Sequence, residues 1–120
     1  HRNETLRNLI QKIDFNEVIV MGSIGCKIAS IVRGESDIYI CLSLPQQSSP
    51  KDWDFAAPEA VLKSSGGAIT NIYNQDLKYG ESSFLQGGVI VASNNKNTHE
   101  ETCLEIKDII QKNNLYPLNN

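Results

Sequence analysis

The sequence has no run that approaches the roughly 18 apolar residues needed to cross a membrane, so no membrane partner is expected. It also lacks an excess of basic residues, because 11 Lys and Arg stand against 14 Asp and Glu, a net charge of −3. This balance excludes a strongly basic surface for a nucleic acid polymer as the main function. The sequence does not start with basic residues followed by an apolar stretch, so it predicts no secretory signal peptide. We therefore expect a cytoplasmic protein.

Cysteine is scarce and irregularly spaced. Cys26, Cys41 and Cys103 are an odd number, form no CxxC pair and each lie in an apolar context. We expect three small, buried side chains in a reducing compartment. A zinc site would need closer Cys and His pairs, which His1 and His99 do not supply. The chain also contains no GxSxG motif, no P-loop and no HExxH motif.

The composition is that of one folded domain. The chain has 120 residues, of which 40% are hydrophobic and 21% charged. Apolar clusters recur along its whole length, which argues against disorder. We expect a single domain over residues 1–120, with a polar tail at residues 114–120 that frays.

Hydrophobic periodicity predicts helices that alternate with strands. Short apolar runs predict buried strands, and apolar residues spaced three and four apart predict helices. The predicted class is α/β, a layered α/β/α sandwich with a mixed, largely parallel sheet. The helices are expected near residues 6–13, 25–33, 53–63 and 98–110, the strands at 18–21, 37–42, 68–73 and 89–92, with a short return strand at 77–79. Thr98 and Glu101 are expected to form a capping box.

Two junctions between a strand and a helix attract attention, because ligands of open α/β sheets collect beyond the carboxyl ends of strands. In the first, a glycine-containing turn at residues 22–27 opens a helix and includes Ser23 and Lys27. A cation in a first helical turn is mildly unfavourable, and a bound anion would resolve that conflict. An ordinary tight turn with a solvated lysine explains the same residues.

The second junction is Trp53-Asp54. A carboxylate here is either the cap of a helix or a ligand for Mg²⁺, which proteins usually hold with one or two carboxylates plus phosphate and water. Asp52 lies two residues earlier and is expected to be a solvated charge. A single carboxylate does not complete a metal site.

Taken together, these stretches resemble the inositol monophosphatase superfamily. The resemblance rests on residues 22–27 and 34–39, on the pattern Trp-Asp-x-Ala-Ala at residues 53–57 and on the glycine pair that follows the helix at residues 66–67. Within the superfamily, the chain is most similar to the 3′(2′),5′-bisphosphate nucleotidases of sulfate assimilation. Residues 1–4 are similar to the end of a Ser-Arg-x-His-like stretch of that group.

The resemblance implies a Mg²⁺-dependent phosphatase, often lithium-sensitive, that acts on a small phosphate ester. It implies that Asp54 binds a metal ion and borders the substrate, so that Asp54 is both the catalytic and the metal-binding residue. Ser23 and Lys27 match the turn that contacts the nucleotide phosphate, and His1 matches a nucleotide-contacting histidine. The implied substrate is adenosine 3′,5′-bisphosphate, with its 5′-phosphosulfate as a further candidate.

The family's first signature, Asp-Pro-x-Asp-Gly-Thr, and the glutamate upstream of it are absent from the sequence. These residues supply most metal ligands, so the chain resembles the C-terminal lobe of the sugar-phosphatase fold. We expect an N-terminal lobe as its partner and no activity from the lobe alone. We also expect an exposed apolar patch where the lobes dock, through which the isolated lobe could form a homodimer.

Two alternatives stay open at this point. One is a related phosphatase with another substrate, such as inositol monophosphate. The other is a non-catalytic module that binds a nucleotide or another anion and has no metal chemistry.

Overall fold

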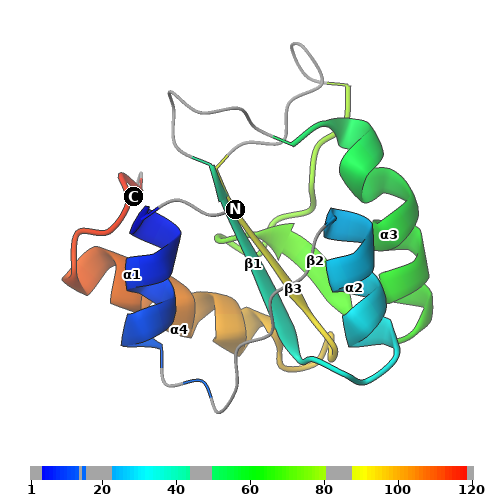
Figure 1. Cartoon of the computed structure of the whole chain (residues 1–120), viewed down its shortest axis with the longest axis horizontal. Coiled ribbons are helices and arrows are strands. Elements are labelled where there is room, and N and C mark those ends of the chain that lie inside the picture. The colour runs from blue at the N-terminus through cyan, green and yellow to red at the C-terminus, as the bar shows by residue number, and fades with distance from the viewer. Residues whose placement is uncertain (1–3, 14, 16–22, 44–49, 81–87, 119–120) are drawn as a thin grey trace.

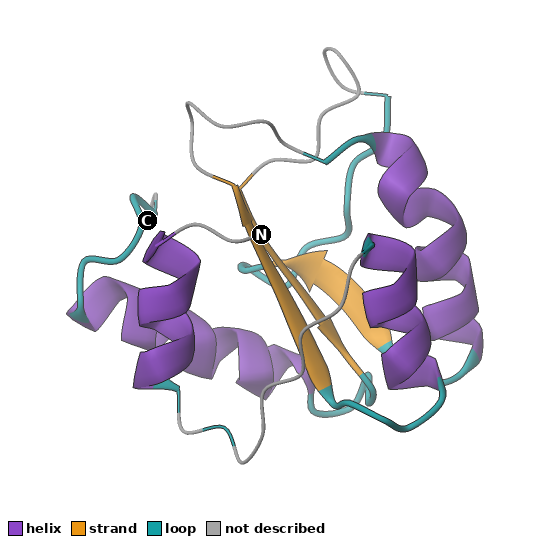
Figure 2. Cartoon of the chain, in the orientation of Figure 1, coloured by secondary structure: helices purple, strands orange, loops and turns teal. Residues whose placement is uncertain are grey.

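The computed structural model describes residues 4–13, 15, 23–43, 50–80 and 88–118. Four helices and three strands form in these ranges (Figures 1 and 2). In chain order they are α1 (Glu4–Lys12), α2 (Ile24–Val32), β1 (Ile38–Ser43), α3 (Asp52–Ser64), β2 (Ala68–Asn71), β3 (Gly88–Ser93) and α4 (His99–Lys112). The α/β class and the positions of these elements agree with the periodicity of the sequence. The strand expected at residues 18–21 lies outside the described residues.

The three described strands form one antiparallel sheet in the order β1-β3-β2. Ile38 pairs with Ser93 at one end of the β1–β3 ladder, and Ala68 pairs with the same Ser93 from the other side. The expectation of a largely parallel sheet is therefore wrong for the described strands. Their continuous apolar runs are typical of parallel sheets because helices cover both faces of such sheets, but an antiparallel sheet covered on both faces needs the same residues.

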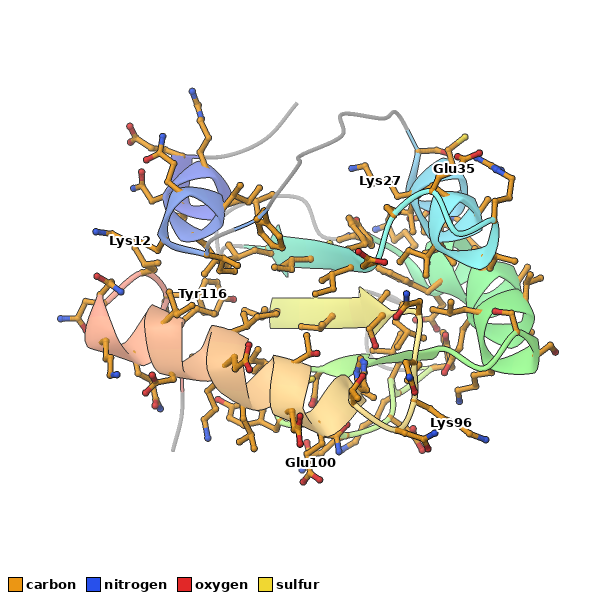
Figure 3. The ribbon with its side chains drawn as sticks, turned by 90° about the horizontal axis from the view of Figure 1, so that it is seen from below. Lys12, Lys27, Glu35, Lys96, Glu100 and Tyr116 are labelled. Atoms are coloured by element: carbon orange, nitrogen blue, oxygen red, sulfur yellow. The ribbon has the colours of Figure 1, made fainter. Side chains whose placement is uncertain are left out.

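Helices cover both faces of the sheet, α1 and α4 on one and α2 and α3 on the other (Figures 1 and 3). The alternation of β3 shows how one strand serves both layers. Val89 and Val91 belong to the core beneath α1 and α4, whereas Ile90 and Ala92 belong to the core beneath α2 and α3. Two separate apolar cores therefore hold the three layers together.

The glycine pair that follows α3 has two different structural roles. Gly66 has a φ of +94°, a conformation that favours glycine, and this lets the chain leave the helix. Gly67 packs so closely against β3 that an added Cβ would lie 2.5 Å from the carbonyl oxygen of Ser93. The pair therefore allows the turn and the close approach of α3 to the sheet.

Two local expectations need correction. Thr98 precedes α4 without a side-chain capping bond, so the expected capping box with Glu101 does not form. The return strand at residues 77–79 is absent from the described chain, where a single bridge joins Asp76 to Thr70.

The segment after α4 packs back on the core through residue 118. Leu115, Tyr116 and Leu118 lie against the apolar cluster beneath α1 and α4. The Tyr116 hydroxyl donates to the carbonyl oxygen of Ser43 at 2.6 Å. Figure 3 shows Tyr116 beside α4 on the side of the sheet. No helix in the described part of the chain is long and apolar enough to cross a membrane.

A buried histidine joins α4 to two strands. His99 is 1% exposed, and its Nε2 lies 2.8 Å from the Thr70 hydroxyl of β2 while its Nδ1 lies 2.6 Å from the Ser93 hydroxyl of β3. Because the Thr70 hydroxyl donates to the carbonyl oxygen of Asn71, it accepts from His99, so Nε2 carries the proton. Nδ1 then accepts from Ser93. The neutral ring is thus satisfied at both nitrogens.

Candidate active site

The candidate site lies on the face of β1 that α2 and α3 cover, around residues 39–41 of the strand (Figure 1). Side chains alternate along β1, so Ile40 and Leu42 enter the core beneath α1 and α4. Tyr39 and Cys41 point to the opposite face and pack beside α2 and α3. The strand therefore presents a phenol and a thiol to the face that the two helix N-termini border.

The first turn of α2 supplies a capping hydroxyl and an ammonium group. Ser23 is the N-cap, and its Oγ accepts the N–H of Cys26 at 3.1 Å. Lys27 is half-buried, and its Nζ lies 5.2 Å from the centre of the Tyr39 ring. Figure 3 shows Lys27 reaching from α2 toward β1. The lysine is thus positioned over the strand, which an ordinary solvated lysine would not require.

The first turn of α3 holds Asp54 in a defined orientation. Its Oδ2 accepts the N–H of Lys51 at 2.8 Å, while its own N–H donates to the carbonyl oxygen of Lys51 at 3.0 Å. Asp54 therefore acts as a helix cap, and its second oxygen, Oδ1, lies outside this bond. Asp52 accepts the N–H of Gly80 at 2.7 Å, so it ties a distant turn to α3 and is not simply a solvated charge.

Electrostatic interactions connect these side chains into one cluster. Burial raises the pKa of the Tyr39 hydroxyl far above its usual range, and the neighbouring Cys41 and the charge of Asp54 raise it further. Burial also raises the pKa of the Cys41 thiol, which Lys27 lowers and Asp54 raises. The carboxylate and the ammonium thus act on the same strand from two different helices. At neutral pH the phenol and the thiol are both protonated.

The structure places Lys27 over Tyr39 of β1 and Ser23 one turn from Lys27, and the helices that carry Lys27 and Asp54 pack against each other. His1 lies outside the described residues. The sequence interpretation missed Tyr39 and Cys41 as parts of this cluster, and it treated all three cysteines as buried. Cys26 is in fact exposed, and Cys41 is half-buried. The alternation of residues 38–43 was the signal that could have placed Tyr39 and Cys41 beside the helices.

The magnesium ion that the resemblance implies would need several oxygen ligands. Asp54 offers a hard carboxylate oxygen, which suits Mg²⁺. Within the described ranges, however, no group of three or more His, Cys, Asp or Glu side chains gathers as a metal site. Asp54 therefore fits the role of one ligand among several.

The sequence of the chain has counterparts among known proteins. Residues 1–111 match the inositol monophosphatase family, and the chain belongs to this family. This confirms the resemblance drawn from the motifs.

The curated relatives identify a group within the family. The chain is 31% identical to a 3′(2′),5′-bisphosphate nucleotidase of Emericella nidulans over 85 residues, which are 71% of this chain and 24% of that protein. It is 33% identical over 88 residues to the Dictyostelium discoideum protein of the same name, covering 72% of this chain and 26% of the relative. A Buchnera aphidicola nucleotidase is 34% identical over 91 residues, 73% of this chain and 32% of the relative. The chain thus spans about a quarter to a third of these relatives.

Proposed function

We propose that the chain is the C-terminal lobe of a Mg²⁺-dependent phosphatase that removes the 3′-phosphate of adenosine 3′,5′-bisphosphate, with its 5′-phosphosulfate as a second substrate. The observation that carries the proposal is the placement of Lys27 over Tyr39 of β1 and of an oriented Asp54 carboxylate in the first turn of the neighbouring helix, in a member of the inositol monophosphatase family. The names of the relatives support the nucleotide over inositol monophosphate as substrate.

In this proposal, different residues of the site bind the metal ion and the phosphate. Asp54 would hold the metal ion, which when bound activates water and neutralises charge on the phosphate. Lys27 supplies a positive charge for the phosphate oxygens, and the N-terminus of α2 adds its own partial positive charge. The Lys51 N–H fixes the Asp54 carboxylate at 2.8 Å, so the ligand is oriented before the metal binds.

The further metal ligands would come from the part of the enzyme outside these 120 residues. Two observations support this division. The chain spans about a quarter of the length of its fungal relative, and Asp54 has no gathered set of partner ligands among the described residues. The 120-residue chain alone is therefore expected to release no phosphate.

Substitution of Asp54 in the complete gene product tests the proposal. We expect Asp54→Asn to abolish Mg²⁺-dependent phosphate release from adenosine 3′,5′-bisphosphate, by roughly 100-fold or more. Asp52→Asn is the matched control, because an amide oxygen can still accept the N–H of Gly80 and activity should remain. A product that is inactive before any substitution would favour a non-catalytic binding module. Faster release from inositol 1-phosphate would contradict the proposed substrate.

A further inference from the structure

The Lys27 ammonium is held by an aromatic ring and not by a carboxylate. Lys63 shows the usual arrangement, because its Nζ lies 2.8 Å from the Glu59 carboxylate, which neutralises its charge. Within the described ranges no carboxylate forms an ion pair with Lys27, and its Nζ lies 5.2 Å from the centre of the Tyr39 ring. An aromatic ring attracts a cation to its face but carries no net charge. The Lys27 ammonium is therefore placed without being neutralised.

The Tyr39 ring is a fixed support for this ammonium. Tyr39 lies in β1, pairs with Ala92 of β3 and packs against the apolar cluster beneath α2 and α3. Burial raises the pKa of the Tyr39 hydroxyl far above its usual range, so at neutral pH the ring is an uncharged phenol. Lysine has a flexible four-carbon stem, and a contact that restricts this stem reduces the entropy lost when an anion binds.

We infer that Tyr39 is a positioning residue of the candidate active site, and that the face of its ring holds the Lys27 ammonium in place for the substrate phosphate. This inference rests on the proposed function, in which Lys27 supplies positive charge for the phosphate oxygens. Tyr39 acts through Lys27 and not through a contact of its own with the substrate. A carboxylate in the place of the ring would compete with the phosphate for the ammonium, whereas the ring leaves the charge available.

A second contact of the same kind provides a control. The Lys107 Nζ lies 5.3 Å from the centre of the Tyr73 ring. Lys107 belongs to α4, which covers the face of the sheet opposite to α2 and α3 (Figure 1). Removal of the Tyr73 ring therefore removes a similar contact outside the candidate site.

Substitutions in the complete gene product test the role of Tyr39, with phosphate release from adenosine 3′,5′-bisphosphate as the assay. Tyr39→Leu removes the ring, and we expect KM to rise about three- to tenfold while kcat stays nearly constant, because a binding interaction is weakened. Tyr39→Phe is the conservative variant; it keeps the ring and should restore KM to within about twofold of the wild-type value. Tyr73→Leu should change neither constant.

A double substitution shows whether Tyr39 acts through Lys27. In a Lys27→Met background, Tyr39→Leu should cause no further rise in KM, because the ring then has no ammonium to hold. Tyr39→Met, which also lacks a ring but keeps the bulk of the side chain, repeats the test if Tyr39→Leu prevents folding.

The outcomes separate the role of Tyr39 from the proposed function. In an active enzyme, an unchanged KM for Tyr39→Leu, an equal rise for Tyr39→Phe or a full further rise in the Lys27→Met background would each overturn the inference and leave the function intact. A complete product without phosphatase activity would contradict the proposed function, and calorimetric dissociation constants of adenosine 3′,5′-bisphosphate then replace KM. The same pattern among these constants would retain the role of Tyr39, and an absence of binding would overturn it.

Discussion

Acidification should weaken the fold through His99, whose neutral ring joins Thr70 and Ser93. Burial lowers the pKa of the His99 imidazole below its ordinary value of 6.5. His99 therefore binds a proton more weakly in the folded protein than in the unfolded chain. The stabilisation is fully present above about pH 6.5 and is lost as the pH falls from there toward the lowered pKa of the folded protein.

The structure explains why protonation of the buried His99 ring is unfavourable. In the neutral ring, Nε2–H donates to Thr70 and Nδ1 accepts from Ser93. A protonated ring would have two donors, so the Ser93 hydroxyl would have to turn and find another acceptor in a site where His99 is only 1% exposed. One proton changes the free energy of unfolding by at most about 1.4 kcal/mol per pH unit. Between about pH 7.5 and pH 5.5, we therefore expect a loss of up to about 1.4 kcal/mol from His99.

Urea unfolding of the wild type and of His99→Gln at several pH values measures this term. The glutamine amide can donate and accept but does not titrate near neutral pH, and all other titrating groups are common to both proteins. We expect the difference in unfolding free energy between the two proteins to shrink as the pH falls. Equal pH dependence in both proteins would refute the reasoning. Nitrogen NMR of the ring gives a second check, because a proton on Nδ1 at neutral pH would contradict the assigned tautomer.

Two further substitutions test the packing. Gly67→Ala should destabilise the chain by about 1–3 kcal/mol, since its Cβ would lie 2.5 Å from a backbone oxygen of β3 that cannot easily move. Gly25→Ala is its control and should be neutral or stabilising in thermal unfolding, because its Cβ would lie 3.8 Å from the nearest atom in a helix. Tyr116→Phe should cost about 1 kcal/mol in urea unfolding by removing the bond to the Ser43 carbonyl, and an unchanged midpoint would show that the tail does not support β1.

Much of the fold could be predicted, because the spacing of apolar residues indicates each helix and a short apolar run indicates each described strand. Whether the strands pair parallel or antiparallel could not be predicted, since residues such as Val89–Ala92 are buried on both faces of the sheet in either case. Sequence could also nominate Lys27 and Asp54, because both open helices directly after a strand or loop. It could not show that Tyr39 joins them, since that depends on which face of β1 the two helices cover.

The hydrogen-bond partners of charged residues were even harder to predict from the sequence. Asp52 and Asp54 look alike in sequence, yet one accepts the N–H of Gly80, 28 residues away, and the other accepts the N–H of Lys51. The first bond is long-range and depends on the path of the chain after β2. The second is local, and a carboxylate at the third position of a helix commonly forms it. Sequence could therefore anticipate the cap role of Asp54 but not the tethering role of Asp52.

The spacing of the Trp-Asp-x-Ala-Ala and Gly-Gly motif follows from the geometry of the 13-residue helix α3. Its first turn carries Asp54, and its inward side carries Phe55, which fills the motif's variable position with a fully buried side chain. Its last turn leads to Gly67, where only a residue without a side chain fits between Leu62 and β3. The aspartate and the glycines are thus the two ends of one rigid element. The motif sets the distance between the candidate site and the point at which α3 is fastened to the sheet, so a change at Gly67 should disturb the placement of Asp54 without touching it.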